Sequence, residues 1–249
     1  MYWQEWLTAL SVNSNVIAIL EPTDGYQTFT LNTTNNITRV LINNPPINLL
    51  DASMLADFHT LLTGPASNLD GPKAIIFSSA NPEYFIAHLD IHILSSDHPV
   101  PPPLNNTELS NLYVNVTRLL ATVPAILIAE VSGQAIAAGN EMIVQMDMRF
   151  ASPGARLGAA EVGVGLTHAA GGLQHLTRLI GPGRAAEYLL GIIDADLDTL
   201  ADIGWVNSAF ESAAEMQAHV DALASRIALW PRGGLVATKQ GIREGGWEF

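Results

Sequence analysis

Short apolar runs that lead through a loop into a helical pattern recur along this chain, and this repetition constrains the fold more than any other feature. The runs KAIIFSS (73–79) and PAILIAEVSG (124–133) have the length of buried strands, and a helical pattern follows each of them. A third pass begins at RFASPGARLG (149–158). Strands that alternate with helices predict an α/β protein built from repeated units.

The segments before and after this series differ from it. Residues 26–42 alternate apolar and polar side chains around a turn at 32–36, which predicts a β-hairpin. Residues 51–62 place apolar side chains at helical spacing after Asp51, a good N-cap residue. AAGNEMIVQMDM (137–148) predicts a helix that begins at small residues. From about residue 171 onward the pattern is helical.

Charge and composition exclude several classes of protein. The chain has 11 basic and 24 acidic residues and a formal net charge of −13, so its field should repel nucleic acid. We expect no nucleic-acid partner. Gly, Pro or a charged residue interrupts every apolar stretch before the roughly 18 residues that a membrane helix needs, so we also expect no membrane association. Cysteine is absent, which excludes disulfides and thiolate nucleophiles.

The segment SGQAIAAGNE (132–141) has the composition of an anion-binding turn. Small residues from Ala135 to Gly139 allow a tight turn and a close approach of the backbone to a ligand. The helix that follows would direct its free N–H groups at the same place. Glu141 falls in the first turn of that helix, where it is a candidate acid or base. The alternative is that Glu141 only satisfies the helix N-terminus.

A second candidate carboxylate, Glu161, lies in ARLGAAEVGVGLTHAAGG (155–172). Its neighbours are small and apolar, and such neighbours desolvate a carboxylate, which favours the protonated form. A group of that kind can exchange a proton near neutral pH. The alternative is a surface glutamate beside Arg156.

Four segments together resemble the enoyl-CoA hydratase/isomerase superfamily, also called the crotonase superfamily. In order they are NNPPINLLD (43–51), YFIAHLDI (84–91), SGQAIAAGNE (132–141) and LGAAEVGVGLTHAAGG (157–172), and the likeness extends from about Tyr26 to Gly241. The resemblance implies an α/β crotonase-like spiral of ββα units with a C-terminal helical region. It implies one domain over residues 1–249, with the spiral core at about 26–190 and the helical region at about 191–249. It also implies a homotrimer or a dimer of trimers.

The resemblance also implies a chemistry. The amides of Ala87 and Ala138 would form an oxyanion hole for the carbonyl of an acyl thioester. Glu141 would orient and deprotonate a water that attacks Cβ, and Glu161 would deliver a proton to Cα. Coenzyme A would enter as part of the substrate, with no further cofactor. We expect no metal site, because His88 and His92 are the one histidine pair with ligand spacing and no third ligand accompanies them.

Several positions depart from the family pattern. His88 and Leu89 stand where relatives usually have Gly and Ala, and His168 stands where a Pro is common. These three residues are candidates for the substrate pocket, although His88 would equally fit a local hydrogen bond that points away from it. Lys239 resembles a tail lysine that contacts coenzyme A. The segment IHILSSDHP (91–99) lacks the basic residue that often helps to hold the coenzyme.

Three functions therefore stay open: a hydratase or isomerase of enoyl thioesters, a lyase, hydrolase or isomerase of the same fold that acts on a substrate without coenzyme A, and a binding protein without activity. The retained glutamates argue against the third. The resemblance implies an intracellular protein. Four glycosylation sequons instead favour secretion, and they begin at Asn32, Asn36, Asn105 and Asn115.

Overall fold

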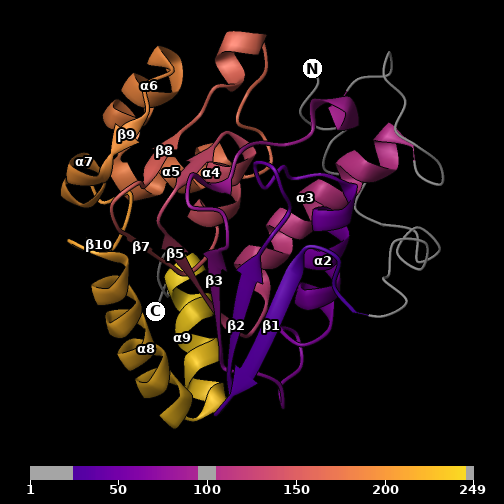
Figure 1. The fold of residues 1–249 in the computed structure, drawn as a ribbon, viewed down its shortest axis with the longest axis vertical. Helices are drawn as coiled ribbons and strands as arrows, with labels where there is room; N and C mark the ends of the chain where they lie inside the picture. The colour runs from indigo at the N-terminus through magenta and orange to yellow at the C-terminus, as the bar shows by residue number, and fades with distance from the viewer. Residues whose placement is uncertain (1–24, 95–104, 245–249) are drawn as a thin grey trace.

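The computed structural model describes residues 25–94 and 105–244, which form two sheets with helices around them (Figure 1). The larger sheet has six strands in the order β1-β2-β3-β5-β7-β10. β1 and β2 form the expected antiparallel hairpin, and the later strands each join in parallel. The strands are β1 (Phe29–Thr34), β2 (Ile37–Ile42), β3 (Ala74–Ser79), β5 (Ile126–Val131), β7 (Met148–Ala151) and β10 (Ser208–Ala209).

The smaller sheet collects the second strand of each later unit. Its order is β4-β6-β8-β9, with β4, β6 and β8 parallel and β9 antiparallel to β8. A chain that places the first strand of a unit in one sheet and the second in the other winds as a spiral, as the resemblance implied. The strands are β4 (Tyr84–Ile86), β6 (Gln134–Ile136), β8 (Arg156–Gly158) and β9 (Ala195–Asp196).

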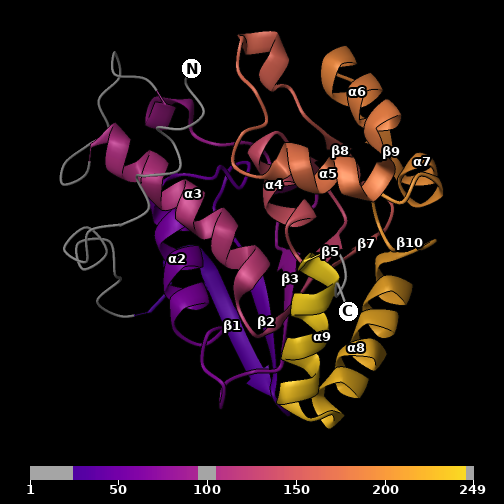
Figure 2. The same cartoon turned by 180° about the vertical axis from the view of Figure 1, so that it is seen from behind.

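Helices cover both faces of the large sheet, which explains the continuous apolar runs in the sequence. Along β3, Ile75 and Phe77 belong to the core that contains α2 (Ala52–Thr63) and α3 (Asn106–Thr122). Ala74 and Ile76 point to the other face, where α8 (Ala213–Leu229) packs. Figure 2 shows α2 and α3 on one side of the sheet and α8 with α9 (Arg232–Glu244) on the other.

The remaining helices lie near the small sheet, at the other end of the molecule from α8 and α9 (Figure 1). They are η1 (Ile91–Leu94), α4 (Ala138–Val144), η2 (Glu161–Val164), α5 (Gly172–Ile180), α6 (Pro182–Gly191) and α7 (Leu197–Asp202). Within the described residues, no helix combines the length and the apolar character needed to cross a bilayer.

Several expected elements are confirmed and others differ in extent. The side chain of Asp51 accepts a hydrogen bond from the amide of Met54, so it caps α2 as predicted. The helix expected over 137–148 ends at Val144, because Met148 already pairs with Ile128 in the large sheet. The C-terminal region also contributes β9 and β10, so it is not purely helical.

Candidate active site

Glu141 lies on α4, where the end of the small sheet meets the N-terminus of this helix. The turn from β6 into α4 passes through Ala137, which has a positive φ of 52°, and Gly139 follows two residues later. A Cβ on Gly139 would overlap the backbone oxygen of Ile86 at the end of β4, so only glycine permits this approach. The close approach brings the end of β4 against the start of α4.

The carboxylate of Glu141 is buried and both of its oxygens are hydrogen-bonded. Glu141 is 3% exposed, which is as low as the exposure of the core residues around it. Oε1 accepts from the amide of Gly172 at 2.8 Å, and Oε2 accepts from the hydroxyl of Tyr113 on α3. Burial raises the pKa of Glu141, and these two hydrogen bonds together with the charge of His168 oppose that rise. Glu141 is therefore a fixed carboxylate that takes up a proton more readily than an ordinary glutamate does.

Glu161 begins η2 and lies against His168, which follows the same turn. Oε1 of Glu161 is 2.7 Å from Nδ1 of His168. Oε2 of Glu161 is buried and has no hydrogen-bond partner among the described residues. This oxygen is consequently the one that a substrate or a water can engage.

Glu141, Glu161 and His168 form one cluster. One ligand atom from each residue lies within 4.8 Å of the others. Such spacing can accommodate a metal ion, but hydrogen bonds account for it here, because His168 bonds to Glu161 and both oxygens of Glu141 have protein donors. The predicted absence of a metal stays a prediction, which metal analysis of the purified protein would check.

The two amides predicted to form the oxyanion hole, those of Ala138 and Ala87, differ in their hydrogen bonding. Ala138 is the first residue of α4, so its N–H has no acceptor within the helix. The N–H of Ala87 instead donates to the backbone oxygen of Asn48 at 3.3 Å. In the same segment, the backbone oxygens of His88 and Leu50 accept hydrogen bonds, but the amide of Leu89 donates none to the described backbone. The amide of His88 donates none there either, so the amides of His88 and Leu89 are the donors of this segment without a described backbone acceptor.

The three pocket candidates separate in the structure. His168 is in the cluster and 3% exposed. The side chain of Leu89 is buried in the main core. His88 is exposed, and its Nδ1 lies 2.8 Å from the backbone oxygen of Leu89, which is the local hydrogen bond considered for it. His88 is therefore not part of the cluster.

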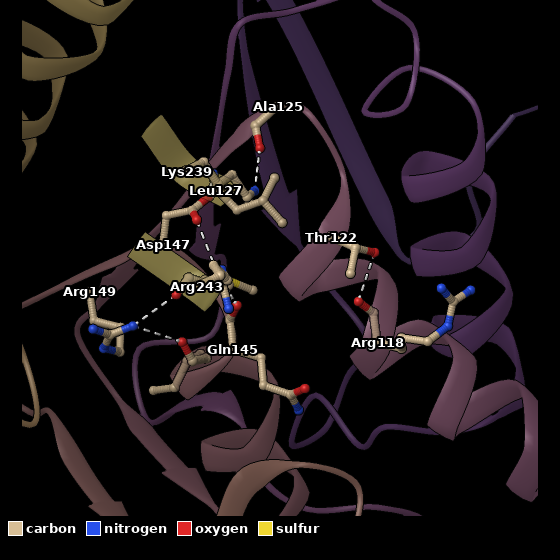
Figure 3. A network of polar contacts seen from close by, with 11 residues as sticks. Arg118, Thr122, Ala125, Leu127, Gln145, Asp147, Arg149, Lys239 and Arg243 are labelled. Carbon is tan, nitrogen blue, oxygen red and sulfur yellow. Dashed lines mark hydrogen bonds and ion pairs between the residues drawn. The ribbon is translucent and has the colours of Figure 1, made fainter. Parts of the chain in front are cut away.

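The expected contact of Lys239 with coenzyme A is not supported. Lys239 is 6% exposed, and its Nζ donates to the backbone oxygen of Ala125 and to Oδ2 of Asp147, both at 2.7 Å (Figure 3). Arg243 on α9 also pairs with Asp147, at 3.1 Å. These bonds attach α9 to the sheet of its own chain and leave no free ammonium group. Of the segment 91–99, only residues 91–94 lie within the described part of the chain.

Three further residues complete the cluster and were not predicted: Tyr113, Asn140 and Trp205. Tyr113 lies in the middle of α3 among apolar residues, and no local pattern marks it. Asn140 did carry a signal, because it is an amide in a helix of otherwise small and apolar residues next to Glu141. It is fully buried, and its Oδ1 accepts from Nε1 of Trp205 at 2.9 Å.

Tyr113→Phe should shift the pH dependence of activity. The hydroxyl of Tyr113 lowers the pKa of Glu141, so its removal raises that pKa further. If Glu141 acts in its ionised form, the acidic limb of the profile of kcat/KM moves to higher pH. We expect a fall of about tenfold at neutral pH, comparable to the loss of one buried hydrogen bond to a charged group. Tyr188→Phe on α6 is the control, and an unshifted profile for Tyr113→Phe would exclude this role.

Comparison with known proteins identifies the family of this chain. The family model for enoyl-CoA hydratase/isomerase matches residues 32–244. A short-chain-enoyl-CoA hydratase of Clostridium acetobutylicum is 30% identical over 207 residues, which cover 83% of this chain and 77% of the relative. A peroxisomal Delta(3,5)-Delta(2,4)-dienoyl-CoA isomerase of Arabidopsis thaliana is 27% identical over 205 residues, which cover 79% of this chain and 73% of the relative.

Solved structures agree in fold. An enoyl-CoA hydratase of Geobacillus kaustophilus HTA426 superposes with a TM-score of 0.78 and 25% identity, over 88% of this chain and 81% of that one. DspI of Pseudomonas aeruginosa gives a TM-score of 0.80 at 24% identity, over 90% and 89%, which supports the fold alone. The fold and these matches thus define a crotonase-type protein. This chain belongs to the enoyl-CoA hydratase/isomerase family.

Proposed function

We propose that this protein is an enoyl-CoA hydratase in which Glu141 and Glu161 move protons and two backbone amides bind the thioester oxygen. The observation that carries the proposal is the pairing of the buried Glu141 with the partly buried Glu161, which keeps one buried oxygen without a partner among the described residues. Two carboxylates held side by side in this way can serve as the base and the acid of one reaction.

In the proposed mechanism Glu141 acts as the base and Glu161 as the acid. Glu141 takes a proton from a water as the water oxygen attacks Cβ of the unsaturated thioester. The electron pair of the carbon–carbon double bond moves towards the carbonyl, which becomes an enolate. The enolate then takes the proton of Glu161 at Cα, and a 3-hydroxyacyl thioester leaves. Because both carboxylates are fixed, the reaction gains from proximity without a metal ion.

The enolate oxygen would be bound by the amides of Ala138 and Leu89. Ala138 lies at the positive end of α4, and the end of β4 packs against that end through Gly139. Each such donor typically stabilises a transition state by about 2.7 to 4 kcal/mol. The assignment replaces Ala87 with Leu89, since the amide of Ala87 is already bonded to Asn48.

The direct test is the loss of enoyl-thioester absorbance when the purified protein meets crotonyl-CoA. We expect turnover with formation of 3-hydroxybutyryl-CoA, identified by mass as the addition of one water. Circular dichroism on the same sample establishes that the protein is folded. A folded protein that leaves both crotonyl-CoA and longer 2-enoyl thioesters unchanged would contradict the proposed hydration.

A second candidate function is isomerisation of an enoyl thioester. The specific observation in its favour is that both oxygens of Glu141 have protein donors, whereas Glu161 keeps a free oxygen. Isomerisation needs one base that removes a proton from Cα and returns it to Cγ. A 3-enoyl thioester such as 3-hexenoyl-CoA distinguishes the two, because an isomerase converts it to the absorbing 2-enoyl thioester without any gain in mass.

A further inference from the structure

A buried line of polar side chains runs from Trp205 to Glu161, and the proposed mechanism leaves most of it unused. Nε1 of Trp205 donates to Oδ1 of Asn140 at 2.9 Å. Nδ2 of Asn140 lies 3.3 Å from Nε2 of His168. Nδ1 of His168 lies 2.7 Å from Oε1 of Glu161. Trp205 and Asn140 have 0% exposure and His168 has 3%, so water does not compete for these bonds.

The indole of Trp205 fixes the direction of every bond in this line. An indole N–H can only donate, so Asn140 must present its carbonyl oxygen to Trp205 and its amino group to His168. The amino group can only donate, which makes Nε2 of His168 an acceptor. The proton of the neutral ring is then on Nδ1, and this N–H donates to Glu161.

A doubly protonated His168 does not fit this line. Its Nε2–H would face the amino group of Asn140, and rotation of that amide would only move the clash between donors to Trp205. The charged neighbours act in the opposite direction. Burial lowers the pKa of His168, but the hydrogen bond of Glu161 and the charges of Glu141 and Glu161 outweigh burial and raise it.

The other titratable group of this cluster, within the described residues, is Tyr113 on α3, which faces Glu141. Burial and the charge of Glu141 raise the pKa of Tyr113 well above its usual value, so the phenol stays neutral. Two carboxylates therefore favour an imidazolium at position 168, and the neutral pair of Asn140 and Trp205 opposes it.

We infer that His168 is a positioning residue: Trp205 and Asn140 set its neutral tautomer, and its Nδ1–H holds one oxygen of Glu161 so that only the other oxygen can exchange a proton. The unpartnered Oε2 of Glu161 is that other oxygen. The inference rests on the proposed role of Glu161 as the acid. A neutral ring matters for that role because an adjacent imidazolium would stabilise the carboxylate form of Glu161 and make it a poorer proton donor.

The tautomer can be measured without any turnover, by NMR of protein labelled with ¹⁵N in its histidine rings. His168→Gln identifies the resonances of His168. We expect protonated Nδ1 and unprotonated Nε2 in the wild type at neutral pH. An Nε2–H tautomer or an imidazolium there would overturn the inference. Because this spectrum uses the wild-type protein, it decides the tautomer even where a variant fails to fold or where crotonyl-CoA is not the substrate.

Two variants test the source of the tautomer. Trp205→Phe removes the indole N–H and frees the amide of Asn140 to rotate, so both neutral tautomers of His168 should appear. Tyr188→Leu is the matched control, because the ring of Tyr188 packs edge-on against that of Trp205 with their centroids 5.4 Å apart. Its loss disturbs the packing of Trp205 but not the hydrogen bond from Trp205 to Asn140. An unchanged ring spectrum in folded Trp205→Phe would count against the inference.

Asn140→Asp tests the link to proton transfer. A carboxylate at position 140 accepts from both Trp205 and a protonated His168, so the imidazolium should persist to higher pH. We expect kcat to fall about tenfold or more at neutral pH, with KM within about twofold, and to recover as the pH rises through the elevated pKa of His168. A loss of kcat that is the same at every pH would indicate damaged packing and would overturn the positioning role.

Discussion

Glu161→Gln should lower kcat for the hydration of crotonyl-CoA by about 10²- to 10⁴-fold, the usual contribution of a positioned acid or base. The substitution keeps the size of the side chain, and the amide oxygen of Gln can still accept from Nδ1 of His168. What it removes is the acidic proton. We expect Glu141→Gln to cause a loss of the same order, because the mechanism uses both groups.

The control for these two substitutions is Glu187→Gln on α6, where the side chain is exposed and outside the cluster. It should leave kcat and KM unchanged. Thermal unfolding of all three variants separates lost chemistry from lost structure. A folded Glu161→Gln protein that keeps more than a third of the wild-type kcat would remove Glu161 from the mechanism, whatever Glu141→Gln does.

Gly139→Ala should destabilise the protein by about 3 kcal/mol or more, at the upper end of the range for overpacked cores. The added Cβ would overlap the backbone oxygen of Ile86 and come within 3.0 Å of its carbonyl carbon. Both are backbone atoms, so relief requires β4 to move away from α4. That movement would also separate the segment of Leu89 from the amide of Ala138, and activity should fall even in molecules that fold.

Gly183→Ala provides the comparison, because a Cβ at this position in α6 meets no heavy atom within 4 Å. It should stabilise the protein by about 0.5 to 1 kcal/mol, since Gly is costly in a helix. Urea unfolding measures both variants. A Gly139→Ala protein within about 1 kcal/mol of the wild type would mean that β4 and α4 can adjust freely, contrary to the close approach described above.

The large sheet could be predicted from the sequence because its central strands are buried on both faces and read as apolar runs. The small sheet could not, since β4, β6 and β8 have three residues each and depend on partners far away in the chain. The helical region predicted at about 191–249 includes α9, but the sequence did not predict how this helix is attached. Lys239 is the one buried residue of α9, and bonds to Asp147 and Ala125 hold the helix in place, which no local apolar pattern reveals.

The candidate site, like the fold, could be predicted only in part. The resemblance placed Glu141 and Glu161 together, and the structure brings their oxygens into one cluster with His168. It did not reveal Tyr113, which comes from α3 at a distance of 28 positions from Glu141 along the chain. It also assigned an oxyanion donor to Ala87, whose amide is occupied by Asn48, because backbone hydrogen bonding cannot be read from a motif.

The hydrogen bond between Glu161 and His168 closes a short loop. The two ends of this loop are anchored in the cluster, and the positions between them are not. The six residues between them, 162–167, are all exposed, whereas the side chains at both ends are held in the cluster. Exposed loop positions tolerate substitution far better than anchored ones do. The segment 162–167 can therefore be replaced by the corresponding loops of relatives. Such a replacement would alter which substrates approach the carboxylates of Glu141 and Glu161 without moving these two side chains.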